Sequence, residues 1–365
     1  MKYWRGFLVA AVLAACTYGL RQFAQAHSAL VDMVYPYATR MGQTFLTDWS
    51  SGVDYCLWQV LVVAFVVLVL ASAVLMVVLK WNPIRWLGWV AAVVSLIVLA
   101  NTIIYGLNQY SGPITQDIRL EEADYTVGEL EAAAVFFRDQ AKAAESSVQR
   151  DGKQVKLPDF EELNAQAENG FNYMKTQEYQ SVFAGSTQPV KPLVWEGYFT
   201  GRGVDGVVMG LTGEAALNMR TPTAIMPFTI CRLMAQRMCI ANAPDANLAA
   251  YLAASHNEQP HYRYAAYLAA YYHCTQLLEK LPDGQSGNVL ERVQAGESAN
   301  MTNDLETLED FYGKLDAEEN EQFCKYLVSL YIQEQVLPQI QEEEALFDPL
   351  NKEQVDLSGI VNAGA

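Results

Sequence analysis

A cation, an amide and a carboxylate occur at helical spacing between Pro227 and Leu252. Arg232 and Gln236 stand four residues apart in an otherwise apolar helical stretch, and Asp245 belongs to the Ala-Pro-Asp turn that begins the next stretch. Side chains at i and i+4 lie on one face of a helix. A planar guanidinium group binds a carboxylate through two parallel hydrogen bonds. The spacing therefore raises the question of whether these three side chains meet in one polar cluster.

Two long uncharged stretches predict helices that span a membrane. Residues 57–79 form a run of 23 residues without a charge, and residues 86–107 form a second run of 22 residues. At about 1.5 Å per residue each run reaches roughly 33 Å, which is enough for a hydrocarbon core of about 30 Å. Both apolar runs are longer than the run that a buried helix of a soluble protein requires. Aromatic residues typical of a membrane interface lie near their ends, namely Trp58, Trp81, Trp86 and Tyr105.

The first apolar segment, residues 5–21, follows a basic start and leaves three alternatives open. It can be a third membrane helix, or a signal peptide that is removed. The stretch "LAAC" at residues 13–16 also resembles a lipoprotein cleavage box, which would place a lipid on Cys16. We favour an uncleaved anchor. In that case residues 22–55 form an extracytoplasmic loop, and residues 1–107 form the membrane region.

Lysine and arginine near the ends of the apolar segments predict the orientation of the chain. Lys2 and Arg5 precede the first segment, and Lys80 and Arg85 flank the link between the second and the third. With these residues on the cytoplasmic side, everything after about residue 108 lies outside the cell. Residues 107–365 carry 38 acidic and 18 basic residues. Because so acidic a domain repels nucleic acid and anionic lipid surfaces, we expect no nucleic acid partner.

The sequence after the membrane region predicts a mainly helical domain over residues 108–345 and a loose tail over 346–365. A Thr-x-x-Glu capping box, formed by Thr126 and Glu129, marks the start of its first helix. Glycine and proline mark a small strand and loop region over about 182–222. Helical patterns predict helices at 126–150, 158–179, 223–241, 244–255, 261–281, 285–295, 301–314 and 317–336.

Neither a glycine motif nor the cysteines of this domain predict a cofactor. "GRGVDG" at residues 201–206 has the spacing of a dinucleotide-binding loop, but the residues after it are not typical of a helix start, so we expect a flexible loop. Cys231 and Cys239 lie about 12 Å apart along one helix and cannot bridge each other. In an oxidising compartment, a disulfide from one of these two cysteines to Cys274 or Cys324 is an alternative. We favour buried free thiols.

The chain resembles a bacterial membrane family catalogued as domain of unknown function 3810 (DUF3810), which looks like a membrane-anchored zinc-peptidase family. The resemblance covers most of residues 1–280, including the membrane region. The stretches that carry it are "YGLNQY" (105–110), "GLTGEAALN" (210–218), "PFTIC" (227–231), "DANLAAYL" (245–252) and "YRYAAYL" (262–268). Where this chain has "PFTIC" and "DANLAAYL", the family has PFxxxHExxH and EANFxAYL. The resemblance implies a zincin-like, extracytoplasmic domain that is predominantly helical and follows three N-terminal transmembrane helices.

The resemblance also implies that the metal site of the family is degenerate here. The first histidine of HExxH falls on Arg232, the catalytic glutamate on Leu233, and the second histidine on Gln236, while the acid of the EAN run falls on Asp245. Arginine stays protonated and does not bind zinc, leucine cannot take a proton from water, and glutamine is a poor zinc ligand. One remaining carboxylate does not hold the ion. We therefore expect no catalytic residue, no bound metal and no other cofactor.

Three downstream histidines do not restore the site. His256 and His261 are five residues apart with Pro260 between them, so they do not share a helical face, and His273 lies further along the chain. We expect these side chains to be exposed or hydrogen-bonded.

The lost metal suggests a role for Arg232. In a working site the zinc charge offsets the inward-pointing carboxylate, and without the ion that carboxylate needs another partner. We expect the Arg232 guanidinium to pair with Asp245, with Gln236 beside them and Glu214 as a second acid. The alternative is that Arg232 extends to solvent and Asp245 is the N-terminal cap of its helix.

These expectations describe a multi-pass membrane protein of bacteria that acts as an inactive pseudo-metallopeptidase. Besides the lipid bilayer, it would bind a peptide or an envelope protein in a cleft to which Glu214, Asn218 and Asn247 contribute. The alternatives are an active membrane-bound metallohydrolase with altered ligands and a purely structural membrane protein. The sequence does not determine the oligomeric state.

Overall fold

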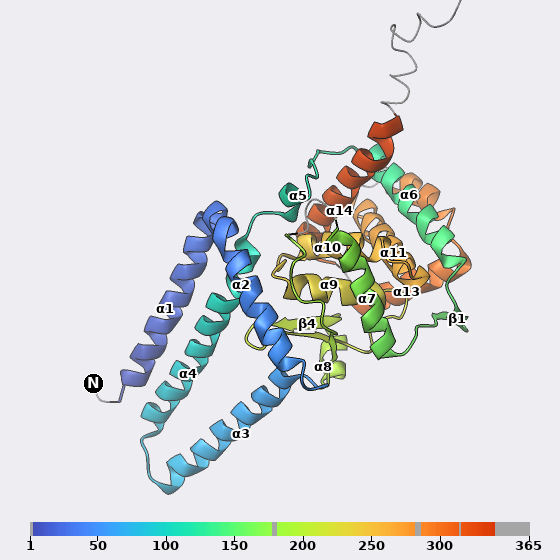
Figure 1. The fold of residues 1–365 in the computed structure, drawn as a ribbon. Coiled ribbons are helices and arrows are strands. Elements are labelled where there is room, and N and C mark those ends of the chain that lie inside the picture. Colours follow the sequence, from blue (N-terminus) through green and yellow to red (C-terminus); the bar gives the residue numbers. More distant parts are fainter. Residues whose placement is uncertain (1–2, 177–180, 282–285, 314, 340–365) are drawn as a thin grey trace, which may run out of the picture.

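The computed structural model describes residues 3–176, 181–281, 286–313 and 315–339. Long helices at the N-terminus lie to one side of a compact, mainly helical body (Figure 1). The tail predicted at 346–365 and the basic residue Lys2 lie outside the described residues.

Three N-terminal helices are long and apolar enough to cross a membrane: α1 (Arg5–Ala26), α3 (Leu57–Val78) and α4 (Pro83–Ile104). The predicted apolar segments are thus confirmed as helices, with shifted ends. α1 continues beyond residue 21. α4 begins three residues early because Pro83 suits the first turn of a helix and the Asn82 side chain accepts a hydrogen bond from the Arg85 amide.

Small residues bring α1 and α4 into close contact. Gly6 faces Gly88 so closely that a Cβ atom on Gly6 would lie 2.5 Å from the Gly88 carbonyl carbon. Ala10 and Ala92 are buried in the same two helices. Helices in membranes commonly associate through such small residues, because these let the backbones approach.

Residues 22–55, predicted as a loop, are mostly helical, and this corrects the sequence analysis. α2 spans Ser28–Ser50 and follows α1 after the single residue His27. It lies between the apolar helices and the helical body in Figure 1. The prediction relied on long apolar runs, which α2 lacks, and so missed the helix although its apolar residues recur at helical spacing.

Short segments lead from α4 into the body: the 3₁₀ helix η1 (Gly106–Tyr110) and α5 (Ile114–Asp117). The body then contains the helices α6 (Val127–Glu145), α7 (Phe160–Met174), α9 (Met226–Arg237), α10 (Ala243–Ser255), α11 (Pro260–Leu278), α12 (Ser286–Gln294), α13 (Ala299–Tyr312) and α14 (Ala317–Tyr331), and the π-helical turn η2 (Ile332–Val336). The predicted helical segments are confirmed with shifted ends, except that residues 146–150, predicted as the end of the first helix, are not helical and Arg150 begins a strand. Residues 177–179, 285 and 314 of the predicted segments lie outside the described residues. Both reciprocal bonds of the Thr126–Glu129 capping box are present at the start of α6.

The region predicted as strands and loops over 182–222 contains a small sheet. Its strand order is β3 (Lys191–Pro192), β5 (Glu214–Leu217), β4 (Gly206–Met209), with β3 parallel and β4 antiparallel to β5. The short helix α8 (Glu196–Thr200) precedes β4. A separate hairpin joins β1 (Arg150–Asp151) to β2 (Gln154–Val155).

The core of the body forms around α9, α10 and α11. α11 packs against α6, α9, α10 and α14, and α9 also contacts β4 and β5. Alanine-rich faces on α10 and α11 are fully buried and allow these helices to approach closely. The cysteines Cys231, Cys239, Cys274 and Cys324 are buried free thiols, as predicted.

Candidate functional site

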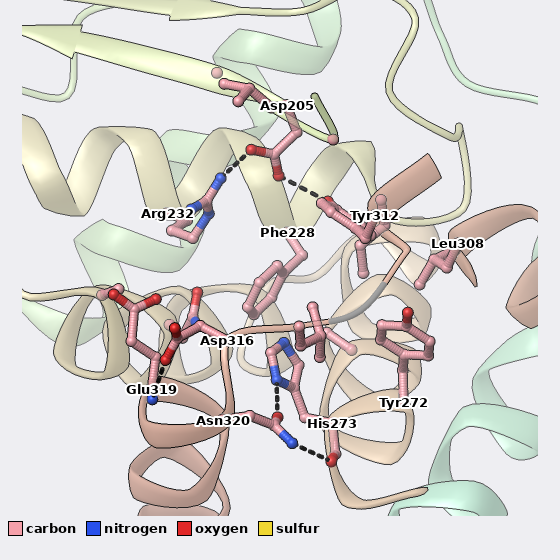
Figure 2. A pocket seen from close by; sticks show the side chains of 18 residues that line it. Asp205, Phe228, Arg232, Tyr272, His273, Leu308, Tyr312, Asp316, Glu319 and Asn320 are labelled. Carbon is pink, nitrogen blue, oxygen red and sulfur yellow. Dashed lines mark hydrogen bonds and ion pairs between the residues drawn. The ribbon is translucent and has the colours of Figure 1, made fainter. Parts of the chain in front are cut away.

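A cavity of about 280 Å³ opens among the last helices of the body. Its lining comes from the loop before β4 and from α9, α10, α11, α13 and the start of α14 (Figure 2). The apolar and aromatic part of the cavity wall comes from Phe228, Tyr272, Leu308 and Leu315. Asp205, Arg232, His273, Asp316, Glu319 and Asn320 supply its ionisable and polar groups.

Asp205 is the centre of a polar network on one wall of this cavity. Arg232 Nη2 donates a hydrogen bond to Asp205 Oδ1 in a close ion pair. Tyr312 Oη donates to Asp205 Oδ2 at 2.7 Å, and Thr229 Oγ1 donates to the same oxygen at 3.2 Å. The Asp205 side chain is 8% exposed and that of Arg232 is 19% exposed. A buried carboxylate needs such partners, because desolvation otherwise costs several kcal/mol.

The glycine motif that the sequence analysis set aside positions Asp205. Gly203 has φ +65°, a conformation that favours glycine, and a Cβ there would lie 3.1 Å from the Tyr312 carbonyl oxygen. Gly206 lets Leu233 pack directly against the strand backbone. The two glycines therefore let the loop approach both α13 and α9, which brings Asp205 between Tyr312 and Arg232.

The predicted partner of Arg232 was wrong. Arg232 pairs with Asp205, whereas Asp245 lies elsewhere, 2% exposed, and accepts a hydrogen bond from the Ile114 amide at 3.3 Å. The alternative assignment of Asp245 is wrong as well, since Asn242 is the N-cap residue of α10 and Asp245 lies in its first turn. Burial raises the pKa of Asp245 to about 6, although bonds from Ile114 and from the Tyr326 side chain act in the opposite direction.

His273 lies across the cavity from this network and is held by Asn320. The two side chains approach to 2.6 Å between His273 Nδ1 and Asn320 Oδ1, while Asn320 Nδ2 donates to the His273 carbonyl oxygen. Since Asn320 Nδ2 donates to the carbonyl oxygen, the atom that faces the ring is Asn320 Oδ1, which only accepts hydrogen bonds. His273 Nδ1 therefore carries the proton, and His273 Nε2 presents a lone pair. Burial, aided by the positive charge of Arg232, lowers the pKa of His273 to about 4 despite the bond to Asn320. The ring is therefore neutral at physiological pH.

The remaining predicted site residues are divided between this cavity and other parts of the fold. Asn247 lines the cavity. Asn218 lies behind the cavity. Its side-chain Nδ2 donates to Thr200 Oγ1 and to the Val204 carbonyl oxygen. Its backbone N–H donates to the Asp205 carbonyl oxygen. It therefore holds the Asp205 loop in place. Leu233 is fully buried, and the Gln236 carbonyl oxygen accepts a bond from the Tyr105 hydroxyl group.

Glu214, predicted to line the cleft, caps the apolar helix α3 instead. Its two carboxylate oxygens accept hydrogen bonds from the amides of Leu57 (2.7 Å) and Trp58 (2.8 Å) at the start of α3. Lys191 Nζ lies 2.7 Å from Glu214 Oε1 and also donates to the Ser50 carbonyl oxygen. Glu214 is 1% exposed. The acid of "GLTGEAALN" thus serves the junction between the body and the apolar helices.

Several cavity residues were missed by the sequence analysis: Asp205, Tyr272, Tyr312, Asp316 and Glu319. The Tyr272 hydroxyl group is buried without a hydrogen-bond partner among the described residues. Burial and the nearby Asp316 charge raise the pKa of Glu319. An acid inside a glycine-rich loop was the available signal for Asp205. Nothing in the local sequence pointed to residues of α13 and α14.

Comparison with known proteins gives a family match. The family described as "Protein of unknown function (DUF3810)" matches residues 32–337, which is most of the chain. The chain belongs to the DUF3810 family. The searches of curated proteins and of solved structures returned no match. The DUF3810 match begins within α2 and includes the two following apolar helices and the whole cavity.

The residues of this DUF3810 chain do not fit the zinc ion that the resemblance to zinc peptidases implies. The position of the first histidine ligand carries Arg232, whose charge is directed to Asp205. The carboxylate at the position of the later acid, Asp245, is turned to the Ile114 amide. Among the residues that the structure describes, no three His, Cys, Asp or Glu side chains gather as a metal site. We derive no chemical step through a metal.

Proposed function

We propose that this protein is a membrane-anchored pseudo-metallopeptidase of bacteria whose helical domain, zincin-like and extracytoplasmic, binds a peptide without cleaving it. The observation that supports the proposal is the Arg232–Asp205 ion pair. The pair sets a fixed organic cation at the position that the resemblance assigns to a metal ligand, and a cavity lies beside it. Such a cavity offers recognition groups but no nucleophile activated by a metal or by a basic histidine.

The charge of the cavity favours a positively charged ligand group. Among the described residues of the lining, Asp205, Asp316 and Glu319 bring three carboxylates, against the one cation Arg232. The neutral His273 contributes a hydrogen-bond acceptor at Nε2. Aromatic rings of Phe228 and Tyr272 complete the wall, and ring faces attract cations. A peptide amino terminus or a lysine side chain carries the N–H donors and the charge that this lining accepts.

The membrane topology belongs to the same proposal. α1, α3 and α4 cross the bilayer, and the basic residues Arg5, Lys80 and Arg85 lie on the cytoplasmic side. Glu214 and Lys191 then hold the outer end of α3 against the sheet of the body. The cavity would face the outside of the cell.

A peptide capture experiment tests the proposed ligand class. Full-length protein in detergent is incubated with a pool of random peptides and with the same pool after acetylation of its amino groups, and retained and cleaved peptides are identified by mass spectrometry. We expect retention of free-amine peptides, intact, at least fivefold above the acetylated pool. Equal retention contradicts the charge-based recognition, and cleavage contradicts the inactive state.

A matched pair of variants locates the binding. Glu319→Gln removes a carboxylate of the cavity, whereas Glu318→Gln removes one from the adjacent residue, which does not line it. Both residues are exposed. The two variants have the same net charge. We expect only Glu319→Gln to weaken retention, and an equal loss in both variants would place the binding elsewhere.

A further inference from the structure

The helix α2 exposes apolar residues and buries polar ones, the reverse of a helix on the surface of a soluble domain. Its exposed face carries large apolar side chains at helical spacing, namely Leu30, Met33, Val34, Tyr37, Met41, Phe45 and Trp49. Met41 is 78% exposed and Phe45 is 71% exposed. Asp48 is the one charged residue that α2 exposes. In water this face would be a continuous apolar stripe along the whole helix.

The opposite face of α2 binds the helical body through polar groups. Arg40 Nε donates to the Met238 carbonyl oxygen at 2.9 Å. Gln43 Nε2 donates to the Gly210 carbonyl oxygen at 2.8 Å, and Thr47 Oγ1 donates to that of Gly213 at 2.7 Å. These contacts fix the rotation of α2 about its axis. The apolar stripe is therefore held facing away from the body.

The outer ends of all three apolar helices meet α2. α1 ends one residue before it, and α3 begins six residues after it. Near the end of α4, the Tyr35 hydroxyl group donates to the carbonyl oxygens of Thr102 (3.1 Å) and Ile103 (2.7 Å). A helix of 23 residues is about 34 Å long, so it cannot stand upright between span ends that lie at one bilayer surface. α2 must run along that surface.

We infer that α2 is an in-plane membrane helix, whose apolar stripe lies in the outer boundary of the bilayer while its polar face carries the body. The inference takes the membrane topology from the proposed function. Its occupant is the lipid bilayer because the stripe continues directly into the spans at both ends. Interfacial helices of this kind bury one apolar face about 5–10 Å into the boundary between headgroups and acyl chains.

In this arrangement, aromatic residues at the start of α3 lie at the same bilayer boundary as α2. Trp58, the second residue of α3, packs edge-on against Trp195 at 5.8 Å between ring centroids. Val194 and Tyr198, beside that pair, are exposed. Tryptophan and tyrosine are typical of the membrane interface. The α8 region would thus touch the bilayer at the end of α2 that leads into α3.

Photocrosslinking in nanodiscs tests the inference. The full chain is prepared with p-benzoylphenylalanine in place of Phe45, or in place of Met41 as a second position on the stripe. It is reconstituted in phosphatidylcholine, which carries no net charge, and irradiated. Lipid adducts are measured by the mass of the intact protein. Leu68, exposed on α3, is the position that reports lipid contact of a span, and Tyr173, exposed on α7, reports the aqueous face.

We expect lipid adducts at Phe45, Met41 and Leu68, and at least tenfold fewer at Tyr173. Adducts at Leu68 without adducts at either stripe position would overturn the inference and leave the topology intact. A crosslink from Phe45 to a second copy of the chain, in place of lipid, would also overturn it. The absence of adducts at Leu68 would overturn the topology and, with it, the placement of α2.

Discussion

At the residue scale, the ion pair between Arg232 and Asp205 joins two segments that are 27 residues apart. The carboxylate has two further donors, Tyr312 and Thr229, which remain when the arginine is removed. The cation has no second carboxylate at ion-pair distance among the described residues. Each charge therefore depends chiefly on the other for compensation in a site that is largely shielded from water.

Replacement of Arg232 by methionine is expected to destabilise the protein by about 3 kcal/mol, because it leaves the Asp205 charge unpaired. Adding Asp205→Asn is expected to recover much of that loss. The free energies of unfolding are measured in detergent by chemical denaturation followed by intrinsic fluorescence. Arg232→Met combined with Asp245→Asn serves as the control, and its effects are expected to add. Strong coupling in the control, without coupling to Asp205, would contradict the pairing.

The pH dependence of stability gives a separate test of Asp245. Because burial raises its pKa from 3.8 to about 6, the folded state binds its proton more tightly than the unfolded state does. This carboxyl group therefore lowers stability as pH rises from about 4 to 6, by at most about 3 kcal/mol, and the penalty persists above pH 6. Asp245→Asn is expected to be more stable than the parent at pH 7.5.

The comparison of parent and Asp245→Asn is made at pH 4 and at pH 7.5, because other groups also titrate in this window. His273, with its pKa lowered to about 4, contributes in the opposite direction: stability falls as pH drops from about 6.5 to 4. The difference between the two proteins isolates Asp245. A stability gap that is the same at both pH values would show that its carboxyl group does not titrate as described.

At the element scale, the start of α3 is fixed by a carboxylate from the sheet. Glu214 of β5 accepts hydrogen bonds from the first free amides of α3. Lys191 of β3 neutralises the charge of Glu214 and donates a hydrogen bond to the carbonyl oxygen of Ser50, the last residue of α2. The arrangement satisfies helix amides that have no partner within the helix, and the negative charge suits the positive end of the helix dipole. α2, α3 and the sheet are thus joined at one buried point.

Loss of the Lys191 charge is expected to cost about 3–5 kcal/mol, because Glu214 would remain as an uncompensated buried charge. Lys191→Met is the test variant, and Lys191→Met with Glu214→Gln is expected to recover part of the loss. Arg220→Met provides the control, since Arg220 pairs with Glu196 at an exposed site and exposed pairs contribute about 0–1 kcal/mol. Equal unfolding free energies for Lys191→Met and Arg220→Met would argue against this junction.

At the scale of the whole molecule, labelling in cells tests the proposed orientation. Ser298 is a poor position for a new cysteine because its hydroxyl group caps α13 and bonds to Glu145. Glu306 is exposed on the same helix. Of the native cysteines, Cys16 alone is exposed and the other five are buried, so Cys16→Ser removes the main competing thiol.

We expect Glu306→Cys, combined with Cys16→Ser, to react with a membrane-impermeant maleimide in intact cells after the outer layers are made permeable to it. Cys16→Ser alone provides the background signal. If Glu306→Cys reacts only after the inner membrane is lysed, the body lies on the cytoplasmic side and the proposed orientation is wrong.

The amino-acid sequence by itself determined the features that depend on neighbours along the chain. An uncharged run of 23 residues is helical in a membrane because backbone groups there must bond within the segment. The Thr126–Glu129 box and the helices from α9 to α14 follow from caps and from apolar periodicity. The family assignment rests on the same kind of local pattern.

Only the tertiary structure decided which distant side chains meet and which way a helical face points. Arg232 pairs with an acid from a loop before β4 and not with Asp245, because Gly203 and Gly206 allow that loop to reach α9. Glu214 caps α3 across 157 residues of sequence. The apolar stripe of α2 was present in the sequence, but the polar contacts to Gly210 and Gly213 turn it outward. Such pairings depend on chain packing, which local propensity and spacing do not encode.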